Sequence, residues 1–392
     1  MTRDCLDPPV ISRLRASFSS IVHTERGPTR LTALFFSSLF AEHPDFRALF
    51  PPALDNLGRR LFQALQFVID NLDDEERVLG FLAQLGRDHR KFGVEQKHYL
   101  AAADALMGAV QGSFTQAIWT PSLTTAWTEL IDLVLHTMSE AAAEDDLPAT
   151  WGATVVDHER RLDDLAIVRL ETDSPIPYAA GQYLSVQIPQ RPRMWRYLSA
   201  AIPANPAGQL EFHVRRVSGG WVSPAIVNET RVGDRWLLGS PLGGLEVDRE
   251  SGLDVLMIGS GTGIAPLRAQ VMEMAMRSRN PRVHLFVGGK YPCDLYDIET
   301  LWHLSLSNPW LTVVPVSEED ENPWWHTAPT PEPPPGLHRR LLGQPGRVVA
   351  EFGSWADRQI QISGSPSMIK TTVYALQRAG TPAHLIKHDP LI

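Results

Sequence analysis

The stretch Val255-Leu256-Met257-Ile258-Gly259-Ser260-Gly261-Thr262-Gly263-Ile264-Ala265-Pro266 decides the fold of the C-terminal part of the chain. Its first four residues are a short apolar run, which predicts a strand buried in a parallel sheet. A glycine loop follows, and Pro266 begins an apolar-periodic stretch that predicts a helix. This order is typical of a dinucleotide-phosphate site, although the glycines of such a turn can also serve only a steric need.

Four further apolar segments follow this stretch, at residues 283–287, 311–316, 359–362 and 385–387. They alternate with helical stretches, which predicts an α/β doubly wound domain with a parallel sheet. Residues 322–336 interrupt this alternation and hold Trp324, Trp325 and several prolines. We expect an extended surface loop there, with a docking or lid role as the alternative.

An earlier region carries residues suited to a flavin nucleotide. Arg196 can offer a planar fork of donors to a pyrophosphate, and Ser199 can add a hydroxyl donor. Ser223-Pro224 looks like an N-cap followed by a first-turn proline, which would direct a helix N-terminus at the same anion. Alternation from Tyr183 onward predicts a strand that could lay the Tyr183 ring against the flavin. Short strands and turns over residues 152–245 predict a small antiparallel β-barrel.

Four elements in this order resemble the ferredoxin–NADP reductase superfamily. They are Arg196-Tyr197-Leu198-Ser199, Gly220-Trp221-Val222-Ser223, Gly261 to Pro266, and Gly364-Ser365-Pro366. The resemblance implies an FAD-binding barrel followed by an NAD(P)-binding domain. The expected cofactor-binding residues of these two domains are Tyr183, Arg196, Tyr197, Leu198, Ser199, Gly220, Val222, Ser223, Gly261, Thr262, Gly263, Ile264, Ala265, Pro266, Gly364 and Pro366.

The first 147 residues contain several amphipathic helical stretches and almost no strand pattern. In one of them Val78, Leu82, Leu85 and His89 recur at helical spacing. His89 therefore lies on the apolar side of its helix, which we expect to end at Gly93. On spacing alone, such a histidine is more often a hydrogen-bonded core residue than a metal ligand.

The helical part, taken with the part that follows it, resembles the flavohaemoglobins. The matching stretches are Phe46 to Phe50, Asp88 to Phe92, Gln96 to Tyr99 and Ala126-Trp127. The resemblance implies an all-α globin in which Phe50 packs on the haem face and His89 is the proximal ligand of the haem iron. It also implies that Tyr99 belongs to a proximal hydrogen-bond relay, and that the cofactors are haem b, FAD and NAD(P)H.

Several positions of the globin part depart from the flavohaemoglobin pattern. Phe36 stands where the family has a distal tyrosine that hydrogen-bonds bound O₂, and Leu57 stands at or near the distal glutamine. The catalytic positions carried over are thus Tyr99, Phe36 and Leu57. The acidic partner of Tyr99 falls near Ala142, with Glu140 as an approximate substitute.

The reductase part departs as well. Leu198 replaces the tyrosine that usually precedes the motif serine, and Ser363 replaces a cysteine. The C-terminal stretch 388–392 lacks the aromatic residue that usually covers the flavin. These changes spare the phosphate contacts and alter the surroundings of the redox rings. Such a site could bind FAD and yet accept hydride from NAD(P)H poorly.

Length, charge and cysteine content constrain the function further. The chain has 392 residues, which favours two or three domains, and we expect the boundaries 1–147, 151–247 and 252–392. A net charge of −9 without a basic block disfavours nucleic acid as a partner. The two cysteines, Cys5 and Cys293, suit a reducing compartment. The sequence shows no signal peptide and no long apolar run, so we expect a cytoplasmic protein without a membrane-spanning segment. We also expect a self-sufficient monomer or dimer.

The domain combination implies a haem–flavin oxidoreductase. A flavin can take a hydride from nicotinamide and pass electrons singly to haem. The flavohaemoglobin resemblance implies nitric oxide dioxygenase activity, with O₂ and NO as substrates and nitrate as product. Two alternatives stay open because of Phe36 and the apolar distal positions. They are a reductase that takes electrons from another organic donor with haem as relay, and a haem-based gas or redox sensor.

Overall fold

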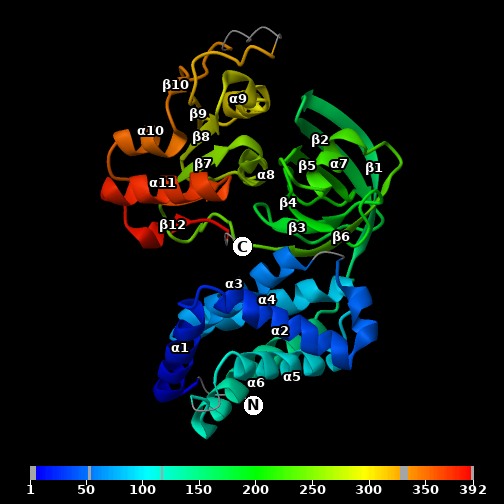
Figure 1. Ribbon diagram of the computed structural model, residues 1–392. Helices are drawn as coiled ribbons and strands as arrows, with labels where there is room; N and C mark the ends of the chain where they lie inside the picture. The colour runs from blue at the N-terminus through cyan, green and yellow to red at the C-terminus, as the bar shows by residue number, and fades with distance from the viewer. Residues whose placement is uncertain (1–5, 52–53, 116–117, 327–333, 390–392) are drawn as a thin grey trace. The chain divides into compact units, whose positions relative to one another are not determined.

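The computed structural model describes residues 6–51, 54–115, 118–326 and 334–389. The chain divides into two compact units, one up to residue 150 and one from Trp151 onward. The first unit is helical, and the second contains both β-sheets (Figure 1). Among the described residues, no helix is both long and apolar enough to span a membrane.

The helical unit is built from six α-helices and two 3₁₀ turns among its described residues. Their bounds are α1 (Pro8–Val22), α2 (Gly27–Glu42), η1 (Pro44–Leu49), α3 (Asp55–Asp70), α4 (Glu75–His89), η2 (Arg90–Phe92), α5 (Gln96–Gly112) and α6 (Pro121–Ala143). Each apolar stripe of the sequence becomes a buried helix face, because apolar side chains spaced three and four apart share one side of a helix. Leu14, Leu82, Trp127 and Leu130 lie at the centre of this core.

Helix α4 and its ending place His89. Asp74 caps the helix by accepting a hydrogen bond from the Arg77 N–H at 3.2 Å. The helix ends at His89, a single 3₁₀ turn follows, and Gly93 adopts the left-handed conformation at φ 70°. Glycine takes this conformation without the steric cost that other residues meet. The predicted end of the helical run at Gly93 agrees with the structure.

The second unit begins with a six-stranded antiparallel sheet in the order β4-β3-β6-β1-β2-β5. Its strands and its one helix are β1 (Trp151–Leu162), β2 (Leu165–Thr172), β3 (Tyr183–Gln187), β4 (Trp195–Ser199), β5 (Gln209–Arg215), α7 (Val222–Asn228) and β6 (Arg235–Leu242). The two edge strands meet through a bridge between Ala200 and Phe212, and the Ala201 N–H donates to the Glu211 carbonyl at 2.8 Å. The sheet therefore closes on itself, as the predicted small barrel requires.

The remainder of the second unit is a six-stranded parallel sheet in the order β10-β9-β8-β7-β11-β12. Its elements are β7 (Asp254–Ser260), η3 (Gly261–Gly263), α8 (Ile264–Ala275), β8 (Val283–Gly289), η4 (Pro292–Asp294), α9 (Ile298–Ser307), β9 (Leu311–Ser317), β10 (Leu341–Leu342), α10 (Pro345–Glu351), β11 (Arg358–Ser363), α11 (Pro366–Arg378), η5 (Ala383–Leu385) and β12 (Ile386–Lys387). The five segments predicted as strands correspond to β7, β8, β9, β11 and β12. The short strand β10 was not predicted.

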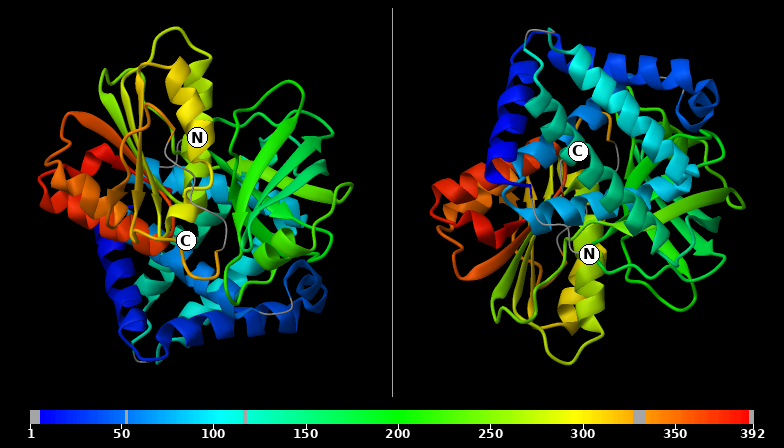
Figure 2. Two further views of the ribbon diagram at one scale, coloured as in Figure 1. Left: turned by 90° about the horizontal axis from the view of Figure 1, so that it is seen from above. Right: turned by 90° about the horizontal axis from the view of Figure 1, so that it is seen from below.

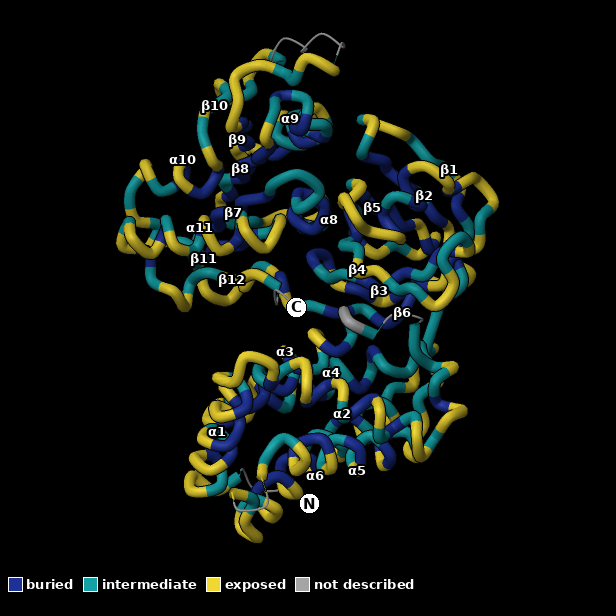
Figure 3. The backbone as a smooth tube through the Cα atoms, viewed as in Figure 1, coloured by how far each residue is buried: buried dark blue, intermediate teal, exposed yellow. Residues whose placement is uncertain are grey.

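Helices cover both faces of this parallel sheet. Met257 and Leu285 point to the face packed by α8 and α9, whereas Leu256 and Ile258 point to the face packed by α10 and α11. Figure 2 shows the two helix pairs on opposite sides of the strands. Figure 3 shows β7 and β8 buried along most of their length, which explains their unbroken apolar sequences. The predicted doubly wound α/β fold is confirmed.

Two local predictions in this unit need correction. Helix α8 begins at Ile264 rather than at Pro266, which lies within the first turn. Helix α7 begins at Val222 with Trp221 at its N-cap position, so Ser223 is not the N-cap.

The loop predicted at 322–336 has no helix or strand in its described residues 322–326 and 334–336, and residues 327–333 lie outside the description. Cys5 and residues 390–392 also lie outside it, and the exact domain boundaries stay predictions.

Candidate functional site

His89 is the candidate metal ligand of the helical unit. Its ring lies 6.2 Å from the Phe92 ring and 6.4 Å from the Tyr99 ring, centroid to centroid. Burial lowers the pKa of His89 to about 4, because the surrounding apolar side chains penalise the imidazolium. The ring is therefore neutral near pH 7, which is the form of imidazole that can coordinate haem iron. The donor chemistry at this position fits a haem.

Tyr99 lies on α5 beside His89 and is buried. Its hydroxyl has no hydrogen-bond partner among the described residues, and burial raises the pKa of Tyr99 to about 12. Glu140 does not act as its partner, because its carboxylate lies 2.9 Å from His136 Nε2 on the same helix, α6. Glu140 therefore does not replace the acidic partner of Tyr99 in this structure. A buried hydroxyl without a partner is costly, which fits a group that awaits a ligand or a water.

The candidate distal residues form an aromatic cluster. The Phe36 ring packs against Phe35, Phe40 and Phe50, with centroids 5.1, 5.9 and 5.9 Å away. Phe50 follows the 3₁₀ turn η1 and also packs on Phe40 at 5.1 Å. None of these four side chains can donate a hydrogen bond.

Leu57 lies in the first turn of α3 and packs against the helical core. Its neighbour Gly58 stands next to Phe36, since a Cβ there would lie 3.7 Å from Phe36 Cε2. The structure thus brings Phe36, Phe50 and the start of α3 together. Gln63, a conceivable alternative donor, is exposed, and the side chain of Asn56 lies outside the description.

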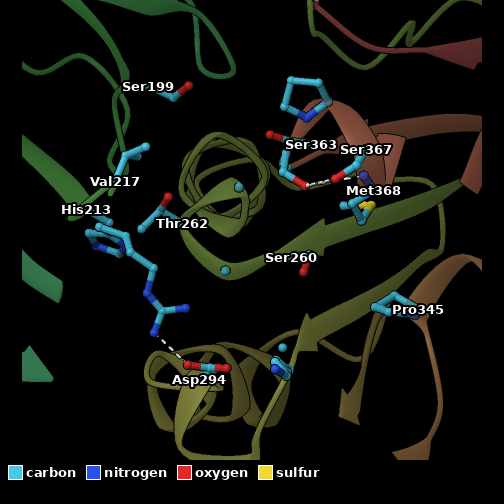
Figure 4. A pocket seen from close by; sticks show the side chains of 18 of the residues that line it. Ser199, His213, Val217, Ser260, Thr262, Asp294, Pro345, Ser363, Ser367 and Met368 are labelled. Carbon is cyan, nitrogen blue, oxygen red and sulfur yellow. Dashed lines mark hydrogen bonds and ion pairs between the residues drawn. The ribbon is translucent and has the colours of Figure 1, made fainter. Parts of the chain in front are cut away.

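The second unit holds a cavity of 820 Å³ lined by both of its sheets. From the barrel come Arg196, Tyr197, Leu198, Ser199 and Ser223, and from the parallel sheet come Gly261, Thr262, Gly263, Gly364 and Pro366. Figure 4 shows Ser199 and Val217 on one side, with Ser363 and Ser367 on the other. A volume of this size suits a large nucleotide ligand.

Other predicted cofactor residues do not line this cavity. Ile264, Ala265 and Pro266 are buried in the first turn of α8 and belong to the core. Val222 is likewise buried in the barrel core, and Gly220 forms a turn by donating its N–H to the Val217 carbonyl at 3.0 Å. These residues lie behind the residues that line the cavity and do not line it themselves. Their direct contact with a cofactor has no support in the geometry.

Tyr183 pairs with Ser199 across strands β3 and β4, and its ring lies 5.3 Å from the Tyr197 ring. Leu184 and Val186 point into the core, as the alternation predicted. The Ser223 hydroxyl accepts a hydrogen bond from the Val217 N–H at 3.1 Å, which leaves its own proton for a ligand in the cavity. Ser223 can thus donate, although it does so from inside a helix rather than as its cap.

The glycine loop meets two different demands. A Cβ on Gly263 would lie 2.4 Å from the Ser363 carbonyl oxygen, so the close approach there is to the protein's own backbone. Gly261 has φ 56°, and a Cβ there would have only Arg215 Nη1 nearby, at 4.0 Å. The loop is therefore a tight turn at Gly263 and an open cavity wall at Gly261. The steric explanation of the glycines therefore holds at Gly263, whereas the dinucleotide-phosphate explanation stays a prediction at Gly261.

A charged network that the sequence motifs did not predict lies between the two sheets. Arg215 on β5 donates to Asp294 Oδ1 at 2.6 Å, and both residues line the cavity (Figure 4). His213 Nδ1 lies 2.9 Å from the Tyr296 hydroxyl, and its Nε2 lies 3.0 Å from Glu211 Oε1. Arg268 on α8 forms an ion pair with Glu211. The contacts of Arg215 with Asp294, of His213 with Tyr296 and of Arg268 with Glu211 join the barrel to the part of the unit that holds the parallel sheet.

Three family models match successive parts of the chain. Residues 33–138 match the globin family, residues 152–247 match the oxidoreductase FAD-binding domain, and residues 257–329 match the oxidoreductase NAD-binding domain. The expected cofactor classes, haem, FAD and a nicotinamide dinucleotide, agree with these three domains.

Relatives of two kinds are found. A ferredoxin–NAD(P)⁺ reductase of Metapseudomonas resinovorans is 29% identical over 60% of this chain and 68% of its own length. A flavohaemoprotein of Deinococcus radiodurans is 27% identical over 70% of this chain and 72% of its own length. The chain spans only 45% of the phenol 2-monooxygenase reductase component of a Pseudomonas species.

A solved flavohaemoglobin from Malassezia yamatoensis has the same fold over the whole chain. Its TM-score is 0.76 at 17% identity, covering 98% of both chains. The order of the domains, their family models and the flavohaemoprotein relative agree with one another. The chain is a globin fused to an FAD- and NAD-binding oxidoreductase module, and in this order of domains it is similar to the flavohaemoglobins.

Proposed function

We propose that the chain is an NAD(P)H-dependent nitric oxide dioxygenase, in which the reductase module supplies electrons to the globin. The observation that carries the proposal is the joining, in one chain, of a neutral buried histidine in a globin core and a large cavity lined by flavin and dinucleotide motifs. When bound, FAD would take a hydride and release single electrons, and haem would provide the site at which O₂ and NO react.

The residues of the second unit would hold the two nucleotides. Arg196 and Ser199 on β4 and the Ser223 hydroxyl can donate to a pyrophosphate from the barrel wall. The Gly261 and Thr262 backbone and the Thr262 hydroxyl face the same cavity from the carboxyl end of β7. Ligands in doubly wound sheets bind at this edge. The cavity thus brings a flavin site and a dinucleotide site together.

In the globin unit, His89 would ligate the haem iron through its neutral ring, with Tyr99 behind it and Phe50 in the aromatic cluster of Phe36. The buried ion pair between Lys91 Nζ and Asp88 Oδ1, 2.5 Å apart, flanks His89 in the chain. Fusing donor and acceptor in one chain raises their effective concentration, so electron transfer becomes intramolecular.

A second function is favoured by the distal cluster. Phe36, Phe40 and Phe50 offer no donor to bound O₂, whose partial negative charge a donor would stabilise by about 1.5–3 kcal/mol. One relative named above is the reductase component of a phenol 2-monooxygenase, and another is a ferredoxin–NAD(P)⁺ reductase. A haem that relays electrons, or reports on gas or redox state, is therefore the alternative.

The two functions differ in NO consumption. Protein loaded with haem and FAD is mixed with NADH, O₂ and NO, and both NO loss and nitrate formation are followed. A dioxygenase forms one nitrate per NO consumed, and turnover continues until NADH is exhausted. Haem that is reduced by NADH but forms no nitrate would contradict the dioxygenase and favour the relay.

A further inference from the structure

The orientation of the His89 ring depends on the end of α4. A histidine that binds a metal usually has its ring held by a hydrogen bond to its other nitrogen. The Tyr99 hydroxyl, which belongs to the ring beside His89, has no hydrogen-bond partner among the described residues and so does not hold His89 in this way. The position of the ring therefore follows from the backbone at His89 and from packing against Phe92 and Tyr99.

Helix α4 lies directly against α6 one turn before His89. A Cβ on Gly86 would lie 2.2 Å from the Met138 carbonyl oxygen and 2.7 Å from Met138 Cα, so only glycine permits this approach of the two backbones. Helix α6 continues to Ala143, and residues 144–150 then lead to β1, which begins at Trp151. The helix that carries His89 thus packs on the helix from which the linker to the second unit starts.

Arg90, the residue after His89, holds this linker. Its Nη2 donates to the Leu147 carbonyl at 2.6 Å, and its Nη1 forms an ion pair with Asp145 Oδ2 at 2.6 Å. Asp145 Oδ1 in turn accepts a hydrogen bond from the Leu147 N–H at 3.1 Å, which keeps the two acceptors together. The Arg90 and Asp145 side chains are only 18% and 9% exposed, so solvent screens their attraction weakly. We call these contacts the Arg90 bridge.

The bridge lies on the covalent route between the two units. Residues 148–150 separate it from β1, so a displacement at the start of β1 reaches Leu147 along the chain. From Leu147 it passes through the rigid guanidinium plane to the residue next to His89. We propose that Arg90 is a positioning residue for the haem iron, which ties the geometry of its ligand His89 to the linker. The inference rests on the proposed function only in taking His89 as the haem ligand.

The test uses the full chain loaded with haem and needs neither NADH nor NO. Resonance Raman spectra of the ferrous, ligand-free protein give the iron–histidine stretching band, and transfer to apomyoglobin gives the rate of haem release. Hydrogen exchange of the Leu147 amide reports whether the bridge is broken. Arg90→Met keeps the apolar stem of the side chain. It should shift the iron–histidine band to lower frequency and release haem about tenfold faster, the factor expected for one lost charge-assisted hydrogen bond.

Arg87→Met is the matched control, because it removes the same charge from the last turn of α4, and Arg87 forms no ion pair with any described residue. It should leave the band and the rate of haem release as in the wild type. Asp145→Asn removes the ion pair and leaves the Leu147 contact, so it should move both quantities in the same direction as Arg90→Met, but less. Arg90→Lys keeps the charge and should restore part of the wild-type values.

An iron–histidine band that stays in place in Arg90→Met while Leu147 exchanges faster would overturn the inference. An equal shift in Arg87→Met would overturn it as well, since the effect would then come from charge alone. If Arg90→Met does not fold, Asp145→Asn is judged by the same criteria. A wild type without an iron–histidine band would instead contradict the ligand role of His89, and with it the haem site of the proposed function.

Discussion

Replacing Gly261 and Gly263 separately with alanine distinguishes the cavity wall from the tight turn. A methyl group on Gly263 would lie 2.4 Å from the Ser363 carbonyl oxygen and 2.6 Å from Gly364 Cα, so the turn between β11 and α11 must move. Overpacking against rigid backbone costs roughly 1–3 kcal/mol, and we expect a loss of about 3 kcal/mol in the free energy of unfolding for Gly263→Ala.

Gly261→Ala meets no such obstacle. Its only cost is the left-handed backbone at φ 56°, which amounts to about 1 kcal/mol for a residue with a side chain. The added methyl would occupy space in the cavity instead. We therefore expect Gly261→Ala to keep most of the stability and to slow flavin reduction by NADH, with a raised apparent Kd.

Chemical denaturation of the loaded protein and stopped-flow reduction of its flavin measure the two effects. Gly252→Ala is the matched control, because Gly252 has φ 66°, has no atom within 4 Å of its Cβ position and does not line the cavity. It should lose about 1 kcal/mol of stability and reduce normally. Gly261→Ala with wild-type reduction kinetics would refute the placement of the dinucleotide, and Gly263→Ala with wild-type stability would refute the turn contact.

Three further predictions concern other parts of the molecule. His89→Ala should fold but bind haem weakly, and normal haem stoichiometry with an unchanged Soret band would exclude the ligand role. Phe36→Tyr should slow O₂ release from the reduced protein about tenfold, as one charge-assisted hydrogen bond would. Phe40→Tyr adds the same hydroxyl to the same cluster as its control, and equal effects of the two would argue against a specific donor position. Burial would raise the pKa of Glu211, but His213 and Arg268 outweigh it and hold that pKa well below its usual range. Glu211→Gln should therefore cost about 3 kcal/mol of unfolding free energy at pH 7, and this difference should narrow as the pH falls below the unfolded value of 4.5. A difference that is the same at pH 7 and pH 3 would contradict the assignment.

The fold could be predicted from the sequence because its strongest signals are local. The apolar run that became β7 is buried on both faces, so it lacks polar residues and is recognised without tertiary information. The helical spacing of Val78, Leu82 and His89 likewise follows from one helix alone. Gly261 follows a strand and Gly93 follows a helix, and both adopt a left-handed backbone conformation that favours glycine. Both positions could therefore be predicted from the local sequence.

Parts of the site could not be predicted, because they depend on contacts between distant segments. Arg268 and Glu211 are 57 residues apart and meet only when α8 packs on the barrel. The position of Ser223 depends on the turn at Val217, so the N-cap pattern of Ser223-Pro224 misled the prediction. Glu318 lines the cavity directly after β9, in contrast, and a search for acids at the ends of predicted strands would have found it.

Transfer of electrons from the dinucleotide to the globin within one chain is the central claim. Its most direct test is anaerobic stopped-flow mixing of the oxidised, fully loaded protein with NADH, with flavin and haem absorbance followed together at several protein concentrations. The flavin should be reduced first, and the haem should follow at a rate that does not depend on protein concentration. A haem that stays ferric while the flavin is reduced, or a haem rate that rises in proportion to protein concentration, would contradict the claim.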